Sequence, residues 1–337
     1  MKLCTFEVAC ATGPVQRVGV VTEAGIVDAT AARIALLEQT LPLSAAVRVG
    51  NAQVPPDMIG LIGSGATGLD WVREAVEQVL RRGQAANGAG QQLLYAQPSV
   101  KLLAPVQRPP NIANFSVWPE HSATAAAKGF SVVANTAEAR VKPYWKGNPD
   151  SIVGPDAVLQ FPPYATELDV ECELVAVVGT GGKDLGVEAA HQAIVGYTIM
   201  NDVSAREIQM IEKKGGRGPS KGKDFDGGNV LGPWIVTSDE VGDVRKLHVS
   251  LHVNGRELSG RDTGSMLWDF GEMLSYVSLG QTVHPGQIIS GGCYPKGSAM
   301  DLDCKLSPGD RVELRISKIG SLFCQLGQKP EKLAYPL

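Results

Sequence analysis

The segment from Leu168 to Gly179, LDVECELVAVVG, constrains the fold more than any other part of the chain. Its first half alternates polar and apolar residues, which is the period of a β-strand. Asp169, Glu171 and Glu173 would therefore project from one face of that strand. Adjacent carboxylates repel each other unless a cation or a proton neutralises them. The segment thus predicts either a cradle for an oxygen-seeking ion or a half-exposed edge strand with a solvated acidic face.

A second segment, Gly196 to Arg206, predicts a buried strand that stops at Asn201-Asp202 and passes into a helix. Catalytic groups are often presented where a strand ends. Asp202 could therefore supply a third carboxylate to the same site. It could equally be a plain helix N-cap, because Asp accepts backbone N–H bonds at that position.

A glycine-rich loop carries Lys221-Gly222-Lys223-Asp224-Phe225. It is not a nucleotide-binding P-loop, because Arg217 stands where the first glycine should be and Asp224 replaces the Ser or Thr. Lys223 is a candidate anchor for a substrate oxygen or carboxylate, the alternative being a solvated loop lysine. The chain also lacks the nucleophile-elbow, zinc-helix and dinucleotide-binding motifs of other enzyme classes.

The order of predicted elements indicates an α+β fold dominated by strands. Arg17 to Asp28 predicts a hairpin, and Leu69 to Arg82 predicts an amphipathic helix that stops at Gly83. The segments 83–92 and 97–110 show neither helical nor strand periodicity, so we place a domain boundary near residue 105. The expected division is a small N-terminal α/β domain, 1–105, and a larger domain, 106–337. Helices in the larger domain are expected at Val187–Val195, Val203–Lys214 and Met266–Val277, among short strands.

Composition excludes several classes of function. Of 337 residues, 44% are hydrophobic and 20% charged, which is ordinary for a soluble globular protein. A net charge of -4 leaves no basic surplus for nucleic acid. No stretch of about twenty apolar residues predicts a membrane span or a secretion signal. The six scattered cysteines indicate reduced thiols, so we expect a cytoplasmic protein.

Six segments taken together resemble the fumarylacetoacetate hydrolase family. They are ELDVECELVAVVG, GYTIMNDVSAREIQ, GKDFDGGNVLGPWIV, VNGREL, HPGQIISGG and LSPGDRVELRISKIGSL, in the family's order across roughly residues 105 to 327. The resemblance implies a mixed β-sandwich roll, a homodimer and a small oxo-acid substrate. It also implies Mg²⁺, or Mn²⁺ or Ca²⁺ in its place, bound by Glu171, Glu173 and Asp202.

The same resemblance assigns further residues to the site. Arg206, Gln209 and Lys223 would face the substrate, and Lys223 would also serve catalysis. The family uses a histidine on a mobile segment, which corresponds here to Asn111 to Lys128, so His121 is the candidate base, assisted by Glu120.

Two positions depart from the family pattern. Asn114, a candidate substrate contact, stands where larger family hydrolases carry an aspartate ligand. Gly292 stands where many members carry the second threonine of Thr-Gly-Thr-Pro, and glycine cannot donate that hydroxyl bond.

These residues predict a metal-dependent hydrolase that cleaves a C–C bond in a 1,3-dicarbonyl or acylpyruvate-type oxo-acid, in aromatic catabolism. An ion with open positions can take both oxygens of such a substrate while a base activates water. Decarboxylation, tautomerisation or isomerisation, and dehydration or hydrolysis of a keto-deoxy sugar acid are alternatives with the same ion. A non-catalytic binding protein that retains the fold is the alternative of another class.

Overall fold

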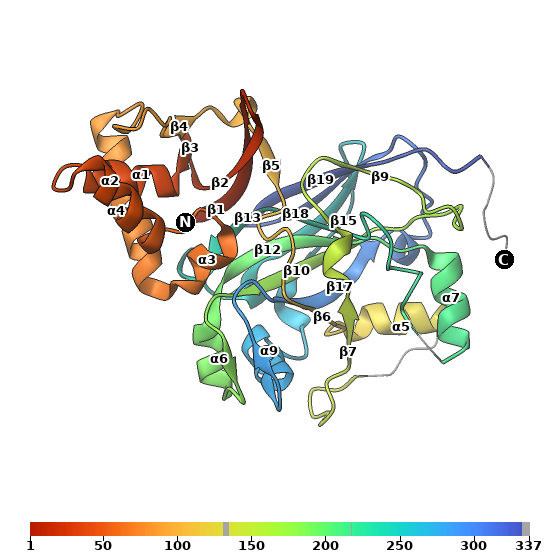
Figure 1. Cartoon of the computed structure of the whole chain (residues 1–337). Coiled ribbons are helices and arrows are strands. Elements are labelled where there is room, and N and C mark those ends of the chain that lie inside the picture. The colour runs from red at the N-terminus through yellow and green to blue at the C-terminus, as the bar shows by residue number, and fades with distance from the viewer. Residues whose placement is uncertain (131–134, 217, 332–337) are drawn as a thin grey trace.

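The computed structural model describes residues 1–130, 135–216 and 218–331, and confirms a strand-dominated α+β fold (Figure 1). The strands are β1 (Lys2–Cys10), β2 (Gly13–Thr22), β3 (Gly25–Asp28), β4 (Leu94–Tyr95), β5 (Lys101–Leu103), β6 (Ile112–Phe115), β7 (Tyr144–Gly147), β8 (Ile152–Val153), β9 (Ala157–Leu159), β10 (Glu171–Val178), β11 (Gly182–Lys183), β12 (Ile194–Asp202), β13 (Asn229–Thr237), β14 (His248–Val253), β15 (Arg256–Asp262), β16 (Thr282–Val283), β17 (Ile288–Ser298), β18 (Arg311–Ile316) and β19 (Gly320–Leu326). The α-helices are α1 (Ala29–Leu37), α2 (Leu43–Gln53), α3 (Met58–Gly63), α4 (Gly65–Arg82), α5 (Pro119–Ala127), α6 (Val187–Ala193), α7 (Arg206–Lys214), α8 (Ser238–Val241) and α9 (Phe270–Ser278). Short 3₁₀ turns include η5 (Met300–Leu302).

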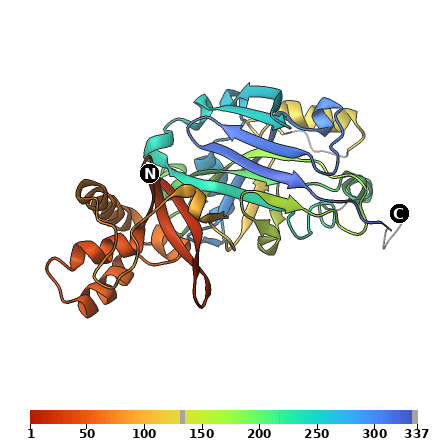
Figure 2. The same ribbon diagram turned by 90° about the horizontal axis from the view of Figure 1, so that it is seen from above.

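Two sheets form the centre of the molecule. The larger has twelve strands among the described residues, ordered β4-β3-β2-β1-β13-β12-β10-β17-β6-β7, with β5 and β8 on side branches. The smaller has the order β15-β14-β18-β19-β9. Figure 2 shows the strands of the smaller sheet lying over those of the larger, with the N-terminal helices to one side.

Strand β10 lies in the middle of the larger sheet and pairs antiparallel with β12 and β17. All eight of its residues are buried. Its apolar second half matches this place, because a strand covered on both faces needs apolar side chains on both. The edge-strand interpretation of the acidic segment is therefore wrong.

The two faces of the larger sheet belong to different hydrophobic clusters. On β10, Cys172 and Leu174 pack with residues of the smaller sheet, whereas Val175 and Val177 pack with the N-terminal helices. This division follows from the two-residue period of a strand. It makes the larger sheet the middle layer of the fold.

The N-terminal residues extend the same sheet. Strand β1 pairs with β13 through Lys2↔Val236 and Leu3↔Ile235. The predicted hairpin is present as β2 and β3, and the predicted helix is present as α4, which ends at Gly83 with φ +60°. Helices α1, α2 and α3 were not predicted from the sequence. The division into two domains at residue 105 stays a prediction.

Two predicted helices begin later than their apolar patterns suggested. Helix α7 begins at Arg206, because Ser204 instead exchanges backbone hydrogen bonds with Asp169. Helix α9 begins at Phe270, because Asp269 and Glu272 form a reciprocal cap.

In the described part of the chain, no helix combines the length and apolarity that crossing a membrane requires.

Candidate functional site

One face of the larger sheet changes from apolar to polar along its strands. Val175 and Val177 of β10 and Met200 of β12 belong to the apolar cluster beneath the N-terminal helices. By the two-residue period, Glu171 and Glu173 continue the β10 row, and Asp202 continues the β12 row. The strand register supports this, because Glu173 pairs with Met200. Neighbouring strands β6 and β17 continue in the same way into Asn114 and Ser290, which pair with each other.

The three carboxylates predicted to share a site do meet. Glu171, Glu173 and Asp202 each offer an oxygen within 4.8 Å of the others, and all three are buried. Asp202 is the last residue of β12, and the N-cap of the following helix is Ala205. The alternative of a helix-capping Asp202 is therefore wrong.

Neutral and positive donors surround the carboxylates. Lys223 Nζ lies 2.6 Å from Oε2 of Glu171 and 2.5 Å from Oδ2 of Asp202. The amide of Asn114 donates to Glu173, at 3.0 Å and 3.2 Å from its oxygens, and to Oδ2 of Asp202 at 3.0 Å. The hydroxyl of Ser290 donates to Glu173 at 2.5 Å. These bonds fix the orientation of each carboxylate.

Burial and mutual repulsion give the three carboxyls different proton affinities. Burial raises the pKa of Glu173 well above its usual range, and the charges of Asp202 and Glu171 add to this. Burial also raises the pKa of Asp202, to about 7, although Lys223 opposes it. Burial would raise the pKa of Glu171 too, but Lys223 and Arg206 together bring it below the ordinary value. The two nearby cations therefore do not offset burial and mutual repulsion at all three carboxyls.

The donor set fits a hard divalent cation. Carboxylate oxygens are the ligands that Mg²⁺, Mn²⁺ and Ca²⁺ prefer. Among the described residues, Oδ1 of Asp202 is buried and has no hydrogen-bond partner. A buried carboxylate oxygen without a partner is costly unless something positive reaches it. The open oxygen and the three converging carboxylates therefore suit an oxygen-seeking ion.

The carboxylates lie at one side of a cavity of about 310 Å³. Its walls include Phe115, Phe130, Tyr144 and Trp145, together with the polar side chains described here. This volume and its mixture of apolar walls with a few polar groups are typical of a site for a small ligand.

Helix α7 and the loop after it bring the predicted substrate-binding residues to this cavity. Lys223 is only 3% exposed, so the solvated-lysine alternative is wrong. Arg206 and Gln209 also line the cavity. The Arg206 guanidinium bonds Asp169 and Glu171, each at 2.7 Å, and donates to Gln209 at 2.8 Å. In this arrangement Arg206 holds both Asp169 and Glu171 in place.

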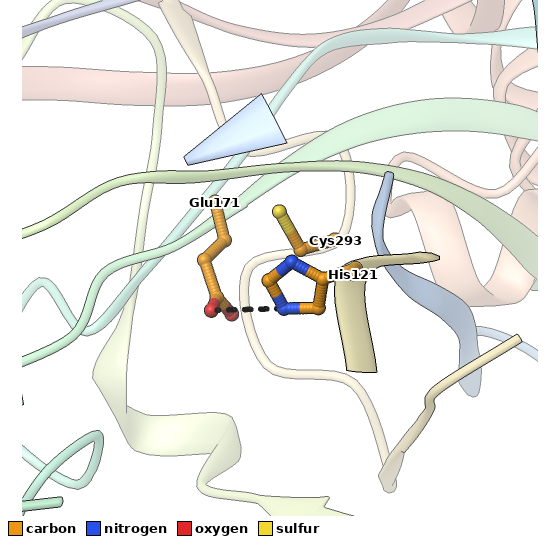
Figure 3. Close-up of side chains that lie close together, drawn as sticks. All are labelled: His121, Glu171 and Cys293. Atoms are coloured by element: carbon orange, nitrogen blue, oxygen red, sulfur yellow. Dashed lines mark ion pairs between the residues drawn. The ribbon is translucent and has the colours of Figure 1, made fainter. Parts of the chain in front are cut away.

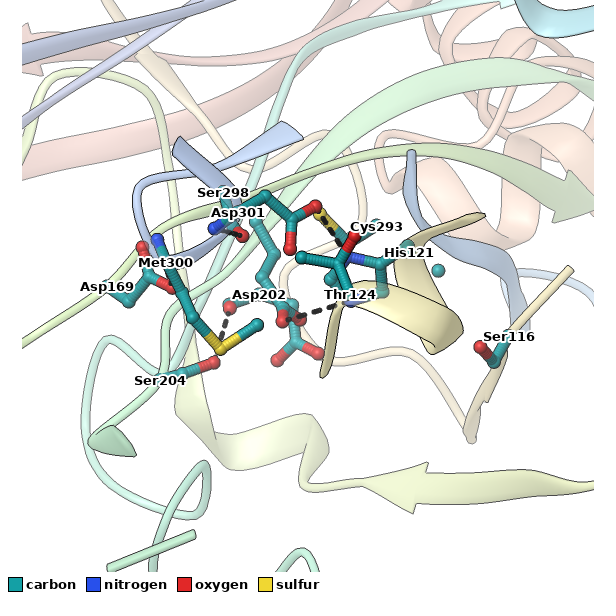
Figure 4. A network of polar contacts seen from close by, with 12 residues as sticks. Ser116, His121, Thr124, Asp169, Asp202, Ser204, Cys293, Ser298, Met300 and Asp301 are labelled. Atoms are coloured by element: carbon teal, nitrogen blue, oxygen red, sulfur yellow. Dashed lines mark hydrogen bonds and ion pairs between the residues drawn. The ribbon is translucent and has the colours of Figure 1, made fainter. Parts of the chain in front are cut away.

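His121, on helix α5, faces the carboxylates from another wall. Its Nε2 lies 3.9 Å from Oε1 of Glu171 (Figure 3). Its Nδ1 lies 2.8 Å from Oδ2 of Asp301, a residue of the η5 turn after β17 (Figure 4). The side chain of Asp301 is 1% exposed and that of His121 13%. The alternative of a surface histidine is therefore wrong.

Glu120 does not join this group. Its carboxylate pairs with Arg261 at 3.3 Å and lies beside a separate hollow near β15. Side chains one position apart on a helix do not share a face, so placing His121 in the cavity turns Glu120 away from it.

The two departures from the family pattern have local causes. Asn114 places an amide against Glu173 and Asp202, so the site keeps a polar contact there without a fourth negative charge. Gly292 has φ +81°, and a Cβ at that position would lie 2.2 Å from the carbonyl oxygen of Phe115. A threonine therefore cannot occupy position 292 without movement of the backbone.

Three groups in or beside the cavity were missed from the sequence: Cys293 and Lys213 line it, and Asp301 contacts His121. Cys293 lies within β17 and Asp301 lies in the η5 turn after it. No spacing rule in the sequence connects either residue to His121. Lys213 also lines the cavity, and it could have been found, because it lies seven residues after Arg206 and hence on the same helix face.

Comparison with known proteins agrees with this geometry. The family model for the fumarylacetoacetate (FAA) hydrolase C-terminal region matches residues 114–326. A Burkholderia ambifaria protein named "Putative hydrolase" is 36% identical over 173 residues, which cover 50% of this chain and 60% of that protein. The chain thus spans about 60% of the length of this curated relative.

Solved structures share the fold over nearly the whole chain. A fumarylacetoacetate hydrolase from Exiguobacterium antarcticum is 26% identical with a TM-score of 0.64, covering 96% of this chain and 99% of that one. A maleylpyruvate hydrolase from Sphingobium sp. SYK-6, in complex with manganese(II) and pyruvate, is 23% identical with a TM-score of 0.66, covering 98% and 100%. A 2-hydroxyhepta-2,4-diene-1,7-dioate isomerase from Mycobacterium marinum is 22% identical with a TM-score of 0.61, covering 98% and 100%. With more than half of its residues matched by the family model, this chain belongs to the fumarylacetoacetate hydrolase family.

Proposed function

We propose that this protein is a divalent-metal-dependent hydrolase that cleaves a C–C bond in a small acylpyruvate or other 1,3-dicarbonyl acid. The observation that carries the proposal is the convergence of Glu171, Glu173 and Asp202 at a cavity that is also lined by His121. A hard-ion site facing a general base is what hydrolysis of such a compound needs.

Glu171, Glu173 and Asp202 would hold the ion, which we propose to be Mg²⁺, with Mn²⁺ or Ca²⁺ as alternatives. The manganese and pyruvate in the Sphingobium maleylpyruvate hydrolase support a divalent ion beside a 2-oxo acid. When bound, the ion supplies positive charge opposite the two substrate oxygens, where negative charge develops during C–C cleavage.

The side chains of the cavity would bind and orient the substrate. Lys223, held between Glu171 and Asp202, places a buried ammonium group where it can donate to a substrate oxygen. The half-buried Lys213, farther along α7, can pair with a charged group at the distal end of the substrate. Gln209, also on this helix, lines the same wall. Asn114 offers an amide beside the carboxylates. The aromatic walls would exclude bulk water from the reacting atoms.

His121 would act as the base. Asp301 accepts the hydrogen bond of Nδ1–H and so leaves Nε2 free to take a proton from the attacking water. The water oxygen then attacks the distal carbonyl carbon, the C–C bond breaks, and its electron pair passes to the oxo-acid fragment, which takes up the proton that His121 removed from water. We do not assign this role to Glu120, because its carboxylate pairs with Arg261 outside the cavity.

An isomerase is the second candidate, because a solved structure with this fold carries that name. Isomerisation would use the same ion and base without adding water. Decarboxylation of an oxo-diacid, a third possibility with the same ion, would instead release CO₂. The reaction products therefore distinguish the three activities.

The direct test is a panel of acylpyruvates, 1,3-diketones, oxaloacetate and dienoic oxo-diacids, incubated with the protein plus Mg²⁺ or plus EDTA and followed by NMR. We expect two acids from an acylpyruvate, with turnover lost in EDTA. We expect Glu173→Gln to abolish turnover, His121→Gln to lower kcat at least about 100-fold, and Glu120→Gln to leave kcat within about twofold. EDTA-resistant turnover would exclude the proposed role of the ion, and a rearranged product of unchanged mass would favour the isomerase.

The family resemblance alone suggests that the protein works as a homodimer. Light scattering of the purified protein would test this, and a monomer that retains full activity would contradict it.

A further inference from the structure

A second group of ligand atoms lies beside the three carboxylates. His121, Glu171 and Cys293 each offer one such atom, and the nitrogen, oxygen and sulfur lie within 4.8 Å of one another (Figure 3). The three come from different elements: α5, the start of β10 and the middle of β17. The proposed reaction has no use for the thiol of Cys293.

We propose that these three side chains form a second metal position, which shares Glu171 with the carboxylate set and takes Zn²⁺. Imidazole, carboxylate and thiolate are all ligands of zinc, and three protein ligands leave its fourth position open. Mg²⁺ does not favour sulfur, so the two positions would select different ions. The inference goes beyond the proposed hydrolysis and does not depend on it.

The surroundings of His121 provide independent support. Zinc-binding histidines generally donate their other ring N–H to a carboxylate or carbonyl group, which fixes the tautomer and the ring. Nδ1 of His121 makes this contact with the buried Asp301 at 2.8 Å, so Nε2 is left facing Glu171. A second contact fixes Asp301 itself, because Oδ2 also accepts from the backbone N–H of Lys296 at 3.0 Å.

The other two ligands are also held in place and available. Cys293 is 4% exposed and follows Gly292, whose positive φ sets the direction of the chain. The only hydrogen bond of its thiol within the described structure is a long one, 3.4 Å from Sγ to the carbonyl oxygen of Tyr294, and a thiol is a weak donor. Oε1 of Glu171 accepts from Arg206 but keeps a second lone pair.

Binding would require one proton to leave. The thiol of Cys293 gives its proton to the buffer, its sulfur donates an electron pair to the ion, and no oxidation state changes. Because the same ion takes Nε2 of His121, a filled second position removes the proposed base from the reaction. Zn²⁺ would therefore compete with turnover while Mg²⁺ supports it.

Cobalt(II) is the probe for this site, because it replaces zinc and reports a thiolate ligand by a near-ultraviolet charge-transfer band. Metal-free protein is titrated with Co²⁺ in the presence of excess Mg²⁺, which fills the carboxylate set. We expect a charge-transfer band that saturates at one Co²⁺ per chain and is lost in Cys293→Ser. Cys10→Ser is the matched control, since Cys10 is exposed at the end of β1, and it should keep the band.

Two further variants test the geometry and serve if Cys293→Ser fails to fold. His121→Gln should weaken Co²⁺ binding at least about tenfold, and Asp301→Asn should weaken it about 10- to 100-fold, as loss of a supporting carboxylate does at other sites. A wild-type protein without the band, or a folded Cys293→Ser that retains it, would overturn the proposal. Failure of the carboxylate site would appear differently, as absent Mg²⁺ binding with the cobalt band intact.

Discussion

Asp301→Asn isolates the charge behind the proposed base. In the structure, Oδ2 of Asp301 contacts Nδ1 of His121 at 2.8 Å and accepts from the N–H of Lys296 at 3.0 Å. Oδ1 is buried without a partner among the described residues. The amide oxygen of an asparagine can therefore take over both contacts, with its NH₂ where Oδ1 was. The ring orientation should survive, and only the negative charge is lost.

The size of the expected fall in kcat follows from the burial of the His121–Asp301 pair. A charge-assisted hydrogen bond contributes about 1.5–3 kcal/mol, against about 1 kcal/mol for a neutral one. Losing up to about 2 kcal/mol of stabilisation for a developing imidazolium lowers kcat roughly 10- to 30-fold, since about 1.4 kcal/mol is a factor of ten. KM should change little, because Asp301 does not line the cavity.

Steady-state kinetics on the acylpyruvate that turns over best would measure both constants. Asp303→Asn is the control, because Asp303 is 85% exposed and pairs only with Lys128 in the described structure. The control should stay within about twofold of wild type, as isolated surface ion pairs contribute little. A folded Asp301→Asn with wild-type kcat would refute the reasoning, as would a loss confined to KM.

Three further predictions concern other parts of the molecule. Burial raises the pKa of Asp28 to about 6, so its folded form keeps a proton that the unfolded chain releases near pH 4. The stability that this group contributes is therefore fully present below about pH 4 and is lost as pH rises through 6. Between pH 4 and 7, the free energy of unfolding of Asp28→Asn, measured in urea, should rise by up to about 3 kcal/mol relative to that of wild type. An equal pH dependence in both proteins would contradict this. Gly292→Ala should lower the free energy of unfolding in urea by at least about 2 kcal/mol, because Gly292 has a positive φ and a Cβ there would meet the Phe115 carbonyl. Gly291→Ala should lower it by under about 1 kcal/mol, because a Cβ at that position would meet nothing closer than 3.4 Å. Equal losses in the two variants would refute the steric account. Lys213→Met should raise KM about 5- to 20-fold for substrates with a distal carboxylate, while Lys214→Met, outside the cavity, should not; unchanged KM in both would remove Lys213 from the substrate site.

Local periodicity was enough to predict the two strands that carry the three carboxylates. The alternation through Glu171 and Glu173 reflects which face each side chain occupies, and that depends only on the strand itself. The end of β12 at Asp202 was recognisable because an apolar run stops at two polar residues. The sequence alone could not decide whether this face was solvated or buried. That depends on β12 and β17 flanking β10, which is a long-range property.

The parts that were missed depend on contacts between distant segments. Asp301 lies 180 residues from His121, and only the path of the chain after β17 brings them together. The placement of Glu120 failed for a different reason. Two neighbouring polar residues were assigned to one site, although adjacent positions of a helix face in different directions. Helices α1 to α3 were missed because their residues are small and apolar on several sides, as in ATAARIALL, so no single face stands out.

The measurement that tests the central claim most directly is calorimetric titration of metal-free protein with Mn²⁺ and Mg²⁺, comparing wild type, Glu173→Gln and Glu120→Gln. Our account predicts one hard-ion site per chain in wild type and in Glu120→Gln. It predicts at least about 100-fold weaker binding in Glu173→Gln, because a buried carboxylate ligand loses its charge. A Glu173→Gln protein that is folded and binds Mn²⁺ as tightly as wild type would contradict the assignment of the metal site.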